Sequence, residues 1–169
     1  MRKYLICIAI FALMLCLMTG CGSQESSDPS CADILNSFRE MTEDGFDTVY
    51  VSGDSEYEDN YDNMYAIKRD LIDDGGIIYT EKGGLADEVS LFHLKDSADV
   101  KIAKEKLEDR LATRRNQFSG YKPEEVYKLD NAEIMVKGNY VALVISSDPP
   151  MTESLLKQAI QSNYDGFDG

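Results

Sequence analysis

The first 21 residues decide how much of this chain is available to fold, because they have the parts of an export signal. Arg2 and Lys3 give a positively charged start, and residues 4–18 that follow are almost all apolar. This apolar run is shorter than the roughly 20 residues that a membrane-spanning helix needs, and it matches the hydrophobic part of a secretory signal peptide. We therefore expect a secretory signal peptide here and the folded domain in the residues that follow it.

Residues 17–21, Leu-Met-Thr-Gly-Cys, resemble the lipobox of bacterial lipoproteins, with Met18 at the position where leucine is more usual. In that family a diacylglycerol is joined to the cysteine sulfur, and the chain is cut just before this cysteine. The resemblance implies a signal peptide over residues 1–20 and a lipidated Cys21 that begins a flexible tether over residues 21–29. Two acyl chains would anchor the protein stably at the extracytoplasmic face of the cell membrane. A plain secretory signal cut elsewhere and an uncleaved N-terminal helix are the alternatives.

The chain after the signal peptide is strongly acidic. Residues 1–20 hold two basic residues and no acidic one, so the remaining 149 residues carry 15 basic and 31 acidic side chains, a formal net charge of −16. Nucleic acid and anionic lipid headgroups would repel such a protein. We therefore expect no nucleic-acid partner, and we expect the domain to stand off the membrane surface.

Cysteine and histidine are too scarce for several kinds of site. Cys7 and Cys16 belong to the signal peptide and Cys21 would carry the lipid, which leaves Cys31 as the one free thiol and allows no intrachain disulfide. Cys31 is either a lone nucleophile or, as its place on an apolar helix face favours, a buried and inert thiol. Because His93 is the only histidine, zinc cannot find three or four nitrogen and sulfur ligands. We expect no metal site and no cofactor, and we expect His93 on a sheet surface.

The rest of the chain predicts one domain over residues 30–164 and a frayed tail over residues 165–169. Apolar residues at helical spacing predict helices that begin at Ser30, near Asp54, at Ala98 and after Asp148. Ser30-x-x-Asp33 has the spacing of a capping box, and Gly120 predicts that the helix from Ala98 ends near Phe118. Apolar runs predict strands at residues 77–80, 88–95, 133–137 and 140–146, with a short extended piece at 48–51. The Asp-Asp-Gly-Gly sequence at 73–76 predicts a break in the chain.

The spacing of the strands predicts how they pair. Gly138-Asn139 between the last two strands favours a two-residue hairpin turn, and tight turns force antiparallel pairing. Helices and strand pairs alternate along the chain, and Phe92 and Leu94 lie on one face of their strand. We therefore predict an α+β fold: a small antiparallel sheet of about four strands, with helices packed mainly on one face in a two-layer arrangement.

The densest acidic stretch, residues 54–63, is the best candidate for a cation site. Its hard oxygen ligands are Asp54, Glu56, Glu58, Asp59 and Asp62. An EF-hand needs Gly at its sixth position and Glu at its twelfth, but counting from Asp54 these positions hold Asp59 and Tyr65. The tyrosines of this stretch recur at helical spacing, which favours a helix with a buried aromatic face and a solvated acidic face. A calcium-responsive module remains the alternative.

Patterns of the common hydrolases and phosphate binders do not occur. The chain has no Gly-x-Ser-x-Gly sequence and no glycine-rich loop between a strand and a helix, and a catalytic triad would have to use His93. Hydrolysis by a carboxylate pair stays open, because many acids are present and no spacing singles out two of them.

A set of short segments resembles a family of uncharacterised lipoproteins found mainly in anaerobic Gram-positive bacteria, a domain of unknown function. The segments are Ala86-Asp87-Glu88-Val89, Phe92-His93-Leu94-Lys95-Asp96, Arg110, Tyr121 and Lys137-Gly138-Asn139-Tyr140-Val141, and the similarity extends over residues 30–160. The resemblance implies a location and a fold but no mechanism. Its polar members form a candidate binding surface, for which turn and cap roles are the competing explanation: Asp87, Glu88, Lys95, Arg110, Tyr121, Lys137 and Asn139.

These observations favour a non-enzymatic, lipid-anchored extracytoplasmic module that binds an envelope protein or a cell-wall component. The anchor, the compact acidic domain and the lack of a catalytic set motivate this prediction. The alternative is a cell-wall-acting enzyme or its substrate-binding accessory, for which a polar cleft with two facing carboxylates would be the structural sign.

Overall fold

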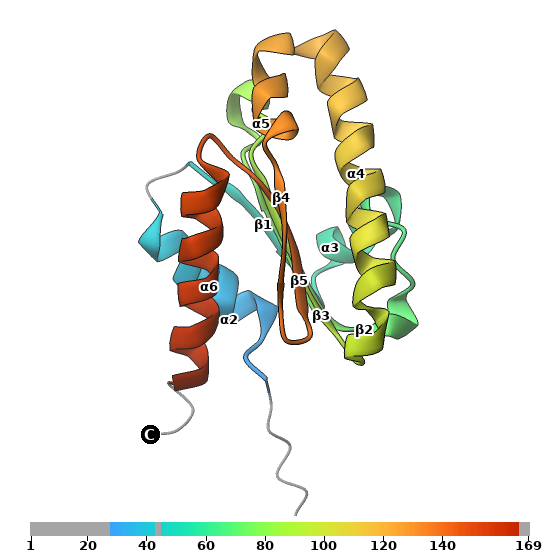
Figure 1. Cartoon of the computed structure of the whole chain (residues 1–169), viewed down its shortest axis with the longest axis vertical. Coiled ribbons are helices and arrows are strands. Elements are labelled where there is room, and N and C mark those ends of the chain that lie inside the picture. Colours follow the sequence, from blue (N-terminus) through green and yellow to red (C-terminus); the bar gives the residue numbers. More distant parts are fainter. Residues whose placement is uncertain (1–27, 43–44, 166–169) are drawn as a thin grey trace, which may run out of the picture.

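The computed structural model describes residues 28–42 and 45–165. The predicted signal peptide, Cys21 and most of the tether lie outside the described residues, so what the sequence says of them stays a prediction. The described strands are β1 (Thr48–Val51), β2 (Ile72–Tyr79), β3 (Glu88–Leu94), β4 (Glu133–Lys137) and β5 (Tyr140–Ile145). The described helices are α2 (Cys31–Met41), α3 (Ser55–Met64), α4 (Val100–Tyr121), α5 (Val126–Asp130) and α6 (Pro149–Asp165) (Figure 1).

The strands form one antiparallel sheet in the order β1-β2-β3-β5-β4. Lys137 pairs with Tyr140 across the Gly138-Asn139 turn, and Gly138 has a φ of +59°, which glycine adopts without strain. The predicted α+β class and the antiparallel hairpin are therefore confirmed. The sheet has five strands rather than about four, because the short piece at residues 48–51 pairs with β2 as a full edge strand.

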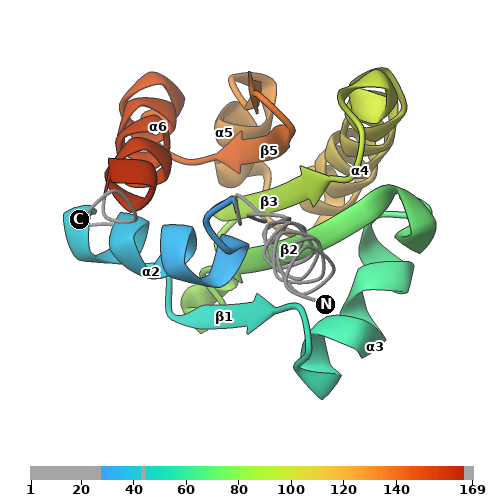
Figure 2. The ribbon, with the colours of Figure 1, turned by 90° about the horizontal axis from the view of Figure 1, so that it is seen from below.

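Helices cover both faces of the sheet, which corrects the prediction of a two-layer fold. Figure 2 shows α2 and α6 on one side of the sheet and α3 and α4 on the other. Each face of the sheet carries its own hydrophobic core, and alternate side chains of β3 belong to one core or the other. Val89 and Leu91 pack with α2 and α6, whereas Phe92 and Leu94 pack with α3 and α4. His93 is consequently buried under the α2 and α6 layer and not on an exposed sheet surface as predicted.

Gly75 and Gly76 lie inside β2, so the prediction of a chain break at residues 73–76 is wrong. A Cβ on Gly75 would lie 2.2 Å from the Tyr57 hydroxyl of α3, and a Cβ on Gly76 would lie 2.5 Å from Cδ1 of Leu35 on α2. The missing side chains let helices approach the strand from both faces. The strand bulges between Ile72 and Asp74, where its register with β3 shifts.

Local signals for the helices agree with the structure. Ser30 caps α2, and its Oγ accepts the Asp33 backbone N–H at 3.1 Å. The predicted aromatic face of α3 is confirmed, since Tyr57 and Tyr61 are buried and Tyr65 is buried just after the helix. The long helix α4 continues through Gly120 to Tyr121 instead of ending at Phe118.

Candidate functional site

A group of charged side chains is buried where β3 begins, on the face that α4 covers. We call it the ionic cluster. Its members are Asp87, Glu88, Arg110, Arg114, Glu125 and Lys128. The two arginines lie four residues apart on α4 and therefore face the sheet together. Charged residues are rarely buried unless they are paired, and here every member has an opposite charge within 4.0 Å.

Glu88 is the centre of this cluster and is fully buried. Arg110 binds it with both arms of its guanidinium, at 2.7 Å from Nη2 to Oε2 and 3.2 Å from Nε to Oε1. The Tyr65 hydroxyl donates to Oε1 at 2.6 Å, and Nε of Arg114 lies 3.4 Å from Oε2. Burial alone would raise the pKa of Glu88, but the two guanidiniums outweigh it, so the pKa lies below its usual range and the carboxylate is charged.

Lys128 holds the other half of the cluster together. Its ammonium lies 2.6 Å from Oδ2 of Asp87 and 2.9 Å from Oε2 of Glu125. Burial alone would lower the pKa of Lys128, but its bonds to these two carboxylates raise it overall, so the ammonium stays charged. Oε2 of Glu125 also accepts the Ala86 backbone N–H at 3.0 Å. The cluster therefore fixes the backbone that leads into β3.

A groove of about 320 Å³ opens beside the ionic cluster, and we call it the α4 groove. Its walls come from the end of β2, the turn after it and the C-terminal part of α4. The lining residues are Tyr79, Thr80, Glu81, Gly84, Leu85, Arg114, Gln117, Phe118 and Tyr121. Arg114 joins groove and cluster, because its Nη2 donates to the Ala86 carbonyl at 3.1 Å and its guanidinium lies over the Phe118 ring, 4.8 Å from the centroid.

Tyr121 forms the open wall of this groove and is 73% exposed. Its ring meets the Phe118 ring edge to face, with centroids 6.2 Å apart. A Cβ on Gly84 would lie 2.9 Å from the Tyr121 hydroxyl, and Gly84 has a φ of +61°, so glycine suits this position on both counts. Lys122 ties the same turn to the end of α4 by donating to the Gly83 carbonyl at 2.9 Å. The arrangement combines an aromatic platform with amide, hydroxyl and charged groups, which suits binding of a polar ligand that has a ring face.

The residues predicted as one binding surface divide into two groups. Asp87, Glu88 and Arg110 meet in the ionic cluster, and Tyr121 lies at the same end of the sheet. Lys95, Lys137 and Asn139 lie toward the other end of β3. In this second group the Lys95 ammonium donates to the Asp70 carbonyl, the Lys137 ammonium donates to the Lys157 carbonyl, and Asn139 accepts the Leu94 N–H through its carbonyl. The structure therefore does not bring the seven residues together.

Several groove and cluster residues are not singled out by local sequence patterns. Arg114, Glu125 and Lys128 lie in three different turns of helix and meet Asp87 and Glu88 only through the tertiary fold. The one usable signal was the four-residue spacing of Arg110 and Arg114, which places two cations on one face of a helix.

The described chain enters the fold at the other end of the sheet, on the α2 and α6 face. We call this region the tether end; it comprises Asp28, Pro29, Asp73, His93, Tyr140 and Tyr164. Oδ2 of Asp28 lies 2.9 Å from Nε2 of His93, and its Oδ1 accepts the Tyr164 hydroxyl at 2.8 Å. The Tyr140 hydroxyl donates to the Pro29 carbonyl, and the His93 and Tyr140 rings stack with centroids 4.5 Å apart.

Cys31, the first residue of α2, is fully buried, which agrees with its interpretation as an inert thiol. Burial, together with the neighbouring Asp74 carboxylate, raises the pKa of its thiol well above the usual value. A thiol held neutral in this way is a weak nucleophile.

The acidic stretch forms the outer face of α3. Arg69 pairs with two of its acids, Glu58 and Asp62. Within residues 28–42 and 45–165, no group of three or more histidine, cysteine, aspartate or glutamate side chains is arranged to hold a metal ion.

Comparison with known protein families gives a match over more than half of the chain. The family described as "Domain of unknown function (DUF4358)" matches residues 51–146, which run from the end of β1 to the end of β5. No curated protein and no solved structure matches the chain. Of the helices that the structure describes, none has the length and apolar character needed to cross a membrane.

Proposed function

This chain belongs to the DUF4358 family, a domain of unknown function, and we propose that it is a lipid-anchored extracytoplasmic module that binds a cell-wall component without chemical turnover. The anchor in this proposal is a diacylglycerol on Cys21, which the lipobox-like residues 17–21 support. The same resemblance supports a location on the outer face of the cell membrane, and the likeness to a lipoprotein family found mainly in anaerobic Gram-positive bacteria supports a Gram-positive source.

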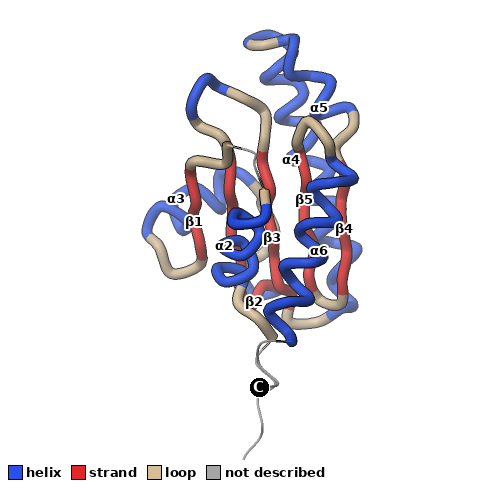
Figure 3. Tube along the Cα trace, turned by 90° about the vertical axis from the view of Figure 1, so that its left-hand side faces the viewer, coloured by secondary structure: helices blue, strands red, loops and turns tan. Residues whose placement is uncertain are grey.

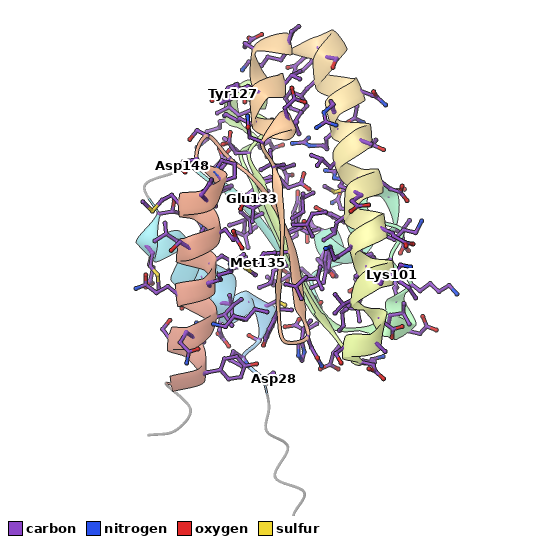
Figure 4. All side chains as sticks on the ribbon, viewed as in Figure 1. Asp28, Lys101, Tyr127, Glu133, Met135 and Asp148 are labelled. Carbon is purple, nitrogen blue, oxygen red and sulfur yellow. The ribbon has the colours of Figure 1, made fainter. Side chains whose placement is uncertain are left out.

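One observation carries the proposal: the α4 groove lies far from the point where the chain enters the fold. Asp28 lies at the lower end of the molecule in Figure 4, whereas Tyr127 lies toward the top, in the helix α5 whose Lys128 belongs to the ionic cluster beside the groove. The groove is also on the face that α4 covers, and the tether end is on the opposite face. A domain held by Cys21 would therefore present the groove away from its anchor.

The lining of the groove supports a wall glycan as the ligand class. The exposed Tyr121 ring offers a platform for stacking against a sugar ring, and Gln117 and Arg114 offer hydrogen bonds to hydroxyl or carboxylate groups. Among the described lining residues Glu81 is the one acid, so the groove lacks the pair of facing carboxylates that glycan hydrolysis uses. These features favour binding over the alternative of a cell-wall-acting enzyme.

The proposal is tested by binding of the unlipidated chain (Cys21→Ala) to purified cell-wall sacculi in a sedimentation assay. Tyr121→Ala should lower the affinity by up to about tenfold, because one aromatic stacking contact is worth about 0.5–1.5 kcal/mol. Tyr127→Ala is the matched control, since Tyr127 is 50% exposed at the same end of the molecule but does not line the groove. Equal loss in both variants, or no binding by the parent chain, contradicts the proposal.

The anchor has a separate test. Cells fed a radioactive or clickable fatty acid should label the full-length protein, and the Cys21→Ala chain should be unlabelled and released from the membrane fraction. Crosslinking of the anchored protein in its native membrane, followed by mass spectrometry, then identifies its neighbours. A recurrent protein partner in place of wall polymer would contradict a wall glycan as the ligand.

A further inference from the structure

Strand β4 is an edge of the sheet that lies open. In the order β1-β2-β3-β5-β4 no described strand pairs with its outer side, and Figure 3 shows it at the margin of the sheet beside α6. Val136 is 41% exposed there. A free edge of this kind offers a row of unpaired N–H and C=O groups to an incoming strand.

The hairpin determines which groups of β4 point outward. Lys137 and Tyr140 flank a two-residue turn, so they form the pair that exchanges both backbone hydrogen bonds. Alternate residues follow the same phase, so Glu133, Met135 and Lys137 direct their backbone groups to β5. Ile134 and Val136 therefore direct theirs to the free edge.

The sequence of β4, Glu-Ile-Met-Val-Lys, is complementary to itself in the antiparallel direction. When two copies pair about Met135, the outward backbone groups of Ile134 meet those of Val136 from the other copy. The same register places Glu133 opposite Lys137 at both ends of the strand, as non-hydrogen-bonded pairs whose side chains lie closest. The direction of the backbone groups, the pairing of apolar side chains and the pairing of opposite charges therefore all favour this one register.

Neither charged side chain at the ends of β4 has an ion-pair partner among the described residues. Lys137 donates to the Lys157 carbonyl at 3.1 Å and to Oε1 of Gln161 at 3.4 Å, and no described carboxylate lies within ion-pair distance of it. Glu133 faces another acid, Glu153, whose hydrogen bond raises the pKa of Glu133, and the nearby Lys157, which pairs with Glu153, offsets this rise only in part. A lysine from a second copy would give Glu133 a direct ion-pair partner.

We propose that two copies of this protein pair antiparallel through β4, centred on Met135, to form a continuous sheet of ten strands. The two-fold axis of such a dimer runs perpendicular to the sheet, so like faces of the two copies share one side.

This arrangement also agrees with anchoring, a point that rests on the proposed function. Both tether ends lie on the α2 and α6 face, so one side of the dimer would face the membrane. Both α4 grooves would then lie on the other side, directed away from the membrane.

A disulfide test fixes both the contact and its register. In the full-length protein in native membranes, Met135→Cys should give a covalent homodimer on mild oxidation, because the two Cα atoms would be about 4.5 Å apart. Val136→Cys alone should not crosslink, since its copies would lie about 9 Å apart, but co-expression with Ile134→Cys should. The parent chain is the background control, as Cys31 is buried. Equal crosslinking of Val136→Cys alone, or none in Met135→Cys and in the mixed pair, overturns the proposal.

Charge reversal separates pairing from a role in the fold. In the Met135→Cys background, Glu133→Lys or Lys137→Glu alone should reduce the crosslinked yield about tenfold, because each creates two like-charge pairs across the interface. The double reversal should restore the crosslinked yield.

A proline in β4 tests the backbone pairing itself. Val136→Pro should abolish the crosslinked homodimer while leaving the melting temperature nearly unchanged, because the lost N–H points away from β5. A double reversal that stays monomeric overturns the proposal, and so does capture of another protein on β4 instead of a second copy. Glycan binding through Tyr121 is measured independently, so either proposal can fail alone.

Discussion

The buried polar residues at the two ends of strand β3 have partners from different parts of the chain. At its start, Glu88 is fully buried and is bound by Arg110, Arg114 and Tyr65, all from within the folded domain. Near its end, His93 is also buried, but one of its two acidic neighbours is Asp28, at the very beginning of the described chain. The first end is a closed network that supports the α4 groove, and the second end fastens the incoming chain to the domain. Breaking the first should therefore damage the fold, whereas breaking the second should loosen only the chain entry.

The largest effect is expected from the ionic cluster. Arg110→Ala leaves Glu88 buried with an incomplete set of partners, which should lower the free energy of unfolding by about 3–5 kcal/mol. Urea denaturation measures this directly. Lys106→Ala is the matched control on the same helix, because it removes one positive charge from an exposed pair with Asp109 and should cost less than about 0.5 kcal/mol. Similar losses in the two variants would mean that the cluster is not the scaffold of this end.

The pH dependence of stability should carry the signature of Glu88. Its pKa is lowered in the folded protein, so the ionised carboxylate contributes stability above its unfolded pKa of about 4.3 and loses that contribution as the pH falls through the folded value. The gap in unfolding free energy between the parent protein and Glu88→Gln should be constant above about pH 5 and should shrink below about pH 4. A gap that grows toward acid pH would contradict a charged Glu88.

The glycines of β2 should give the next largest effect. Gly75→Ala forces a methyl group against Tyr57, and Gly76→Ala forces one against Leu35, so each should cost about 1–3 kcal/mol in urea denaturation. Gly45→Ala is the control, because nothing lies within 4 Å of a Cβ at that position. Tolerance of both β2 substitutions would show that the helices do not need this close approach.

The tether end should give a smaller and more local effect. Asp28→Ala removes the carboxylate beside His93 and Tyr164, and since Asp28 is partly exposed the loss of unfolding free energy should be about 1 kcal/mol or less. Limited proteolysis should nevertheless cut faster ahead of α2. Tyr164→Phe, which removes only the hydroxyl, should reproduce part of this change. Unaltered cleavage in both variants would contradict a fastening role for Asp28.

Calcium should have the smallest effect. Two acids of the α3 face, Glu58 and Asp62, already pair with Arg69, so the melting temperature should be the same in millimolar calcium and in chelator. A rise of several degrees with calcium would establish the calcium-responsive module as the better account of this stretch.

The sequence predicted features that depend on local periodicity. The tyrosine face of α3, the Ser30 cap and the turn at Gly138 all follow from residues a few positions apart, and the structure confirms them. Features that depend on distant partners were not predictable in this way. Gly75 and Gly76 indicated a break because two adjacent glycines usually mark a turn, whereas here they make room for Tyr57 and Leu35.

The same limit applies to the candidate site. Asp87, Glu88, Arg110 and Tyr121 were singled out, but their partners Arg114, Glu125 and Lys128 become neighbours only after α4 and α5 fold onto the sheet. His93 was expected on a surface because one covered face was predicted, and a second helical layer buries it. Side-chain alternation identifies the two faces of a strand, but it does not tell whether one or both are covered when both carry apolar residues.

Hydrogen exchange with and without solubilised wall glycan reports on both ends of the same molecule at once. We expect slower exchange with glycan at residues 79–85 and 114–121, which form the α4 groove, and no change at residues 28–41, which form the chain entry and α2. Protection at the chain entry without protection at the groove would contradict the assignment of ligand binding to the α4 groove.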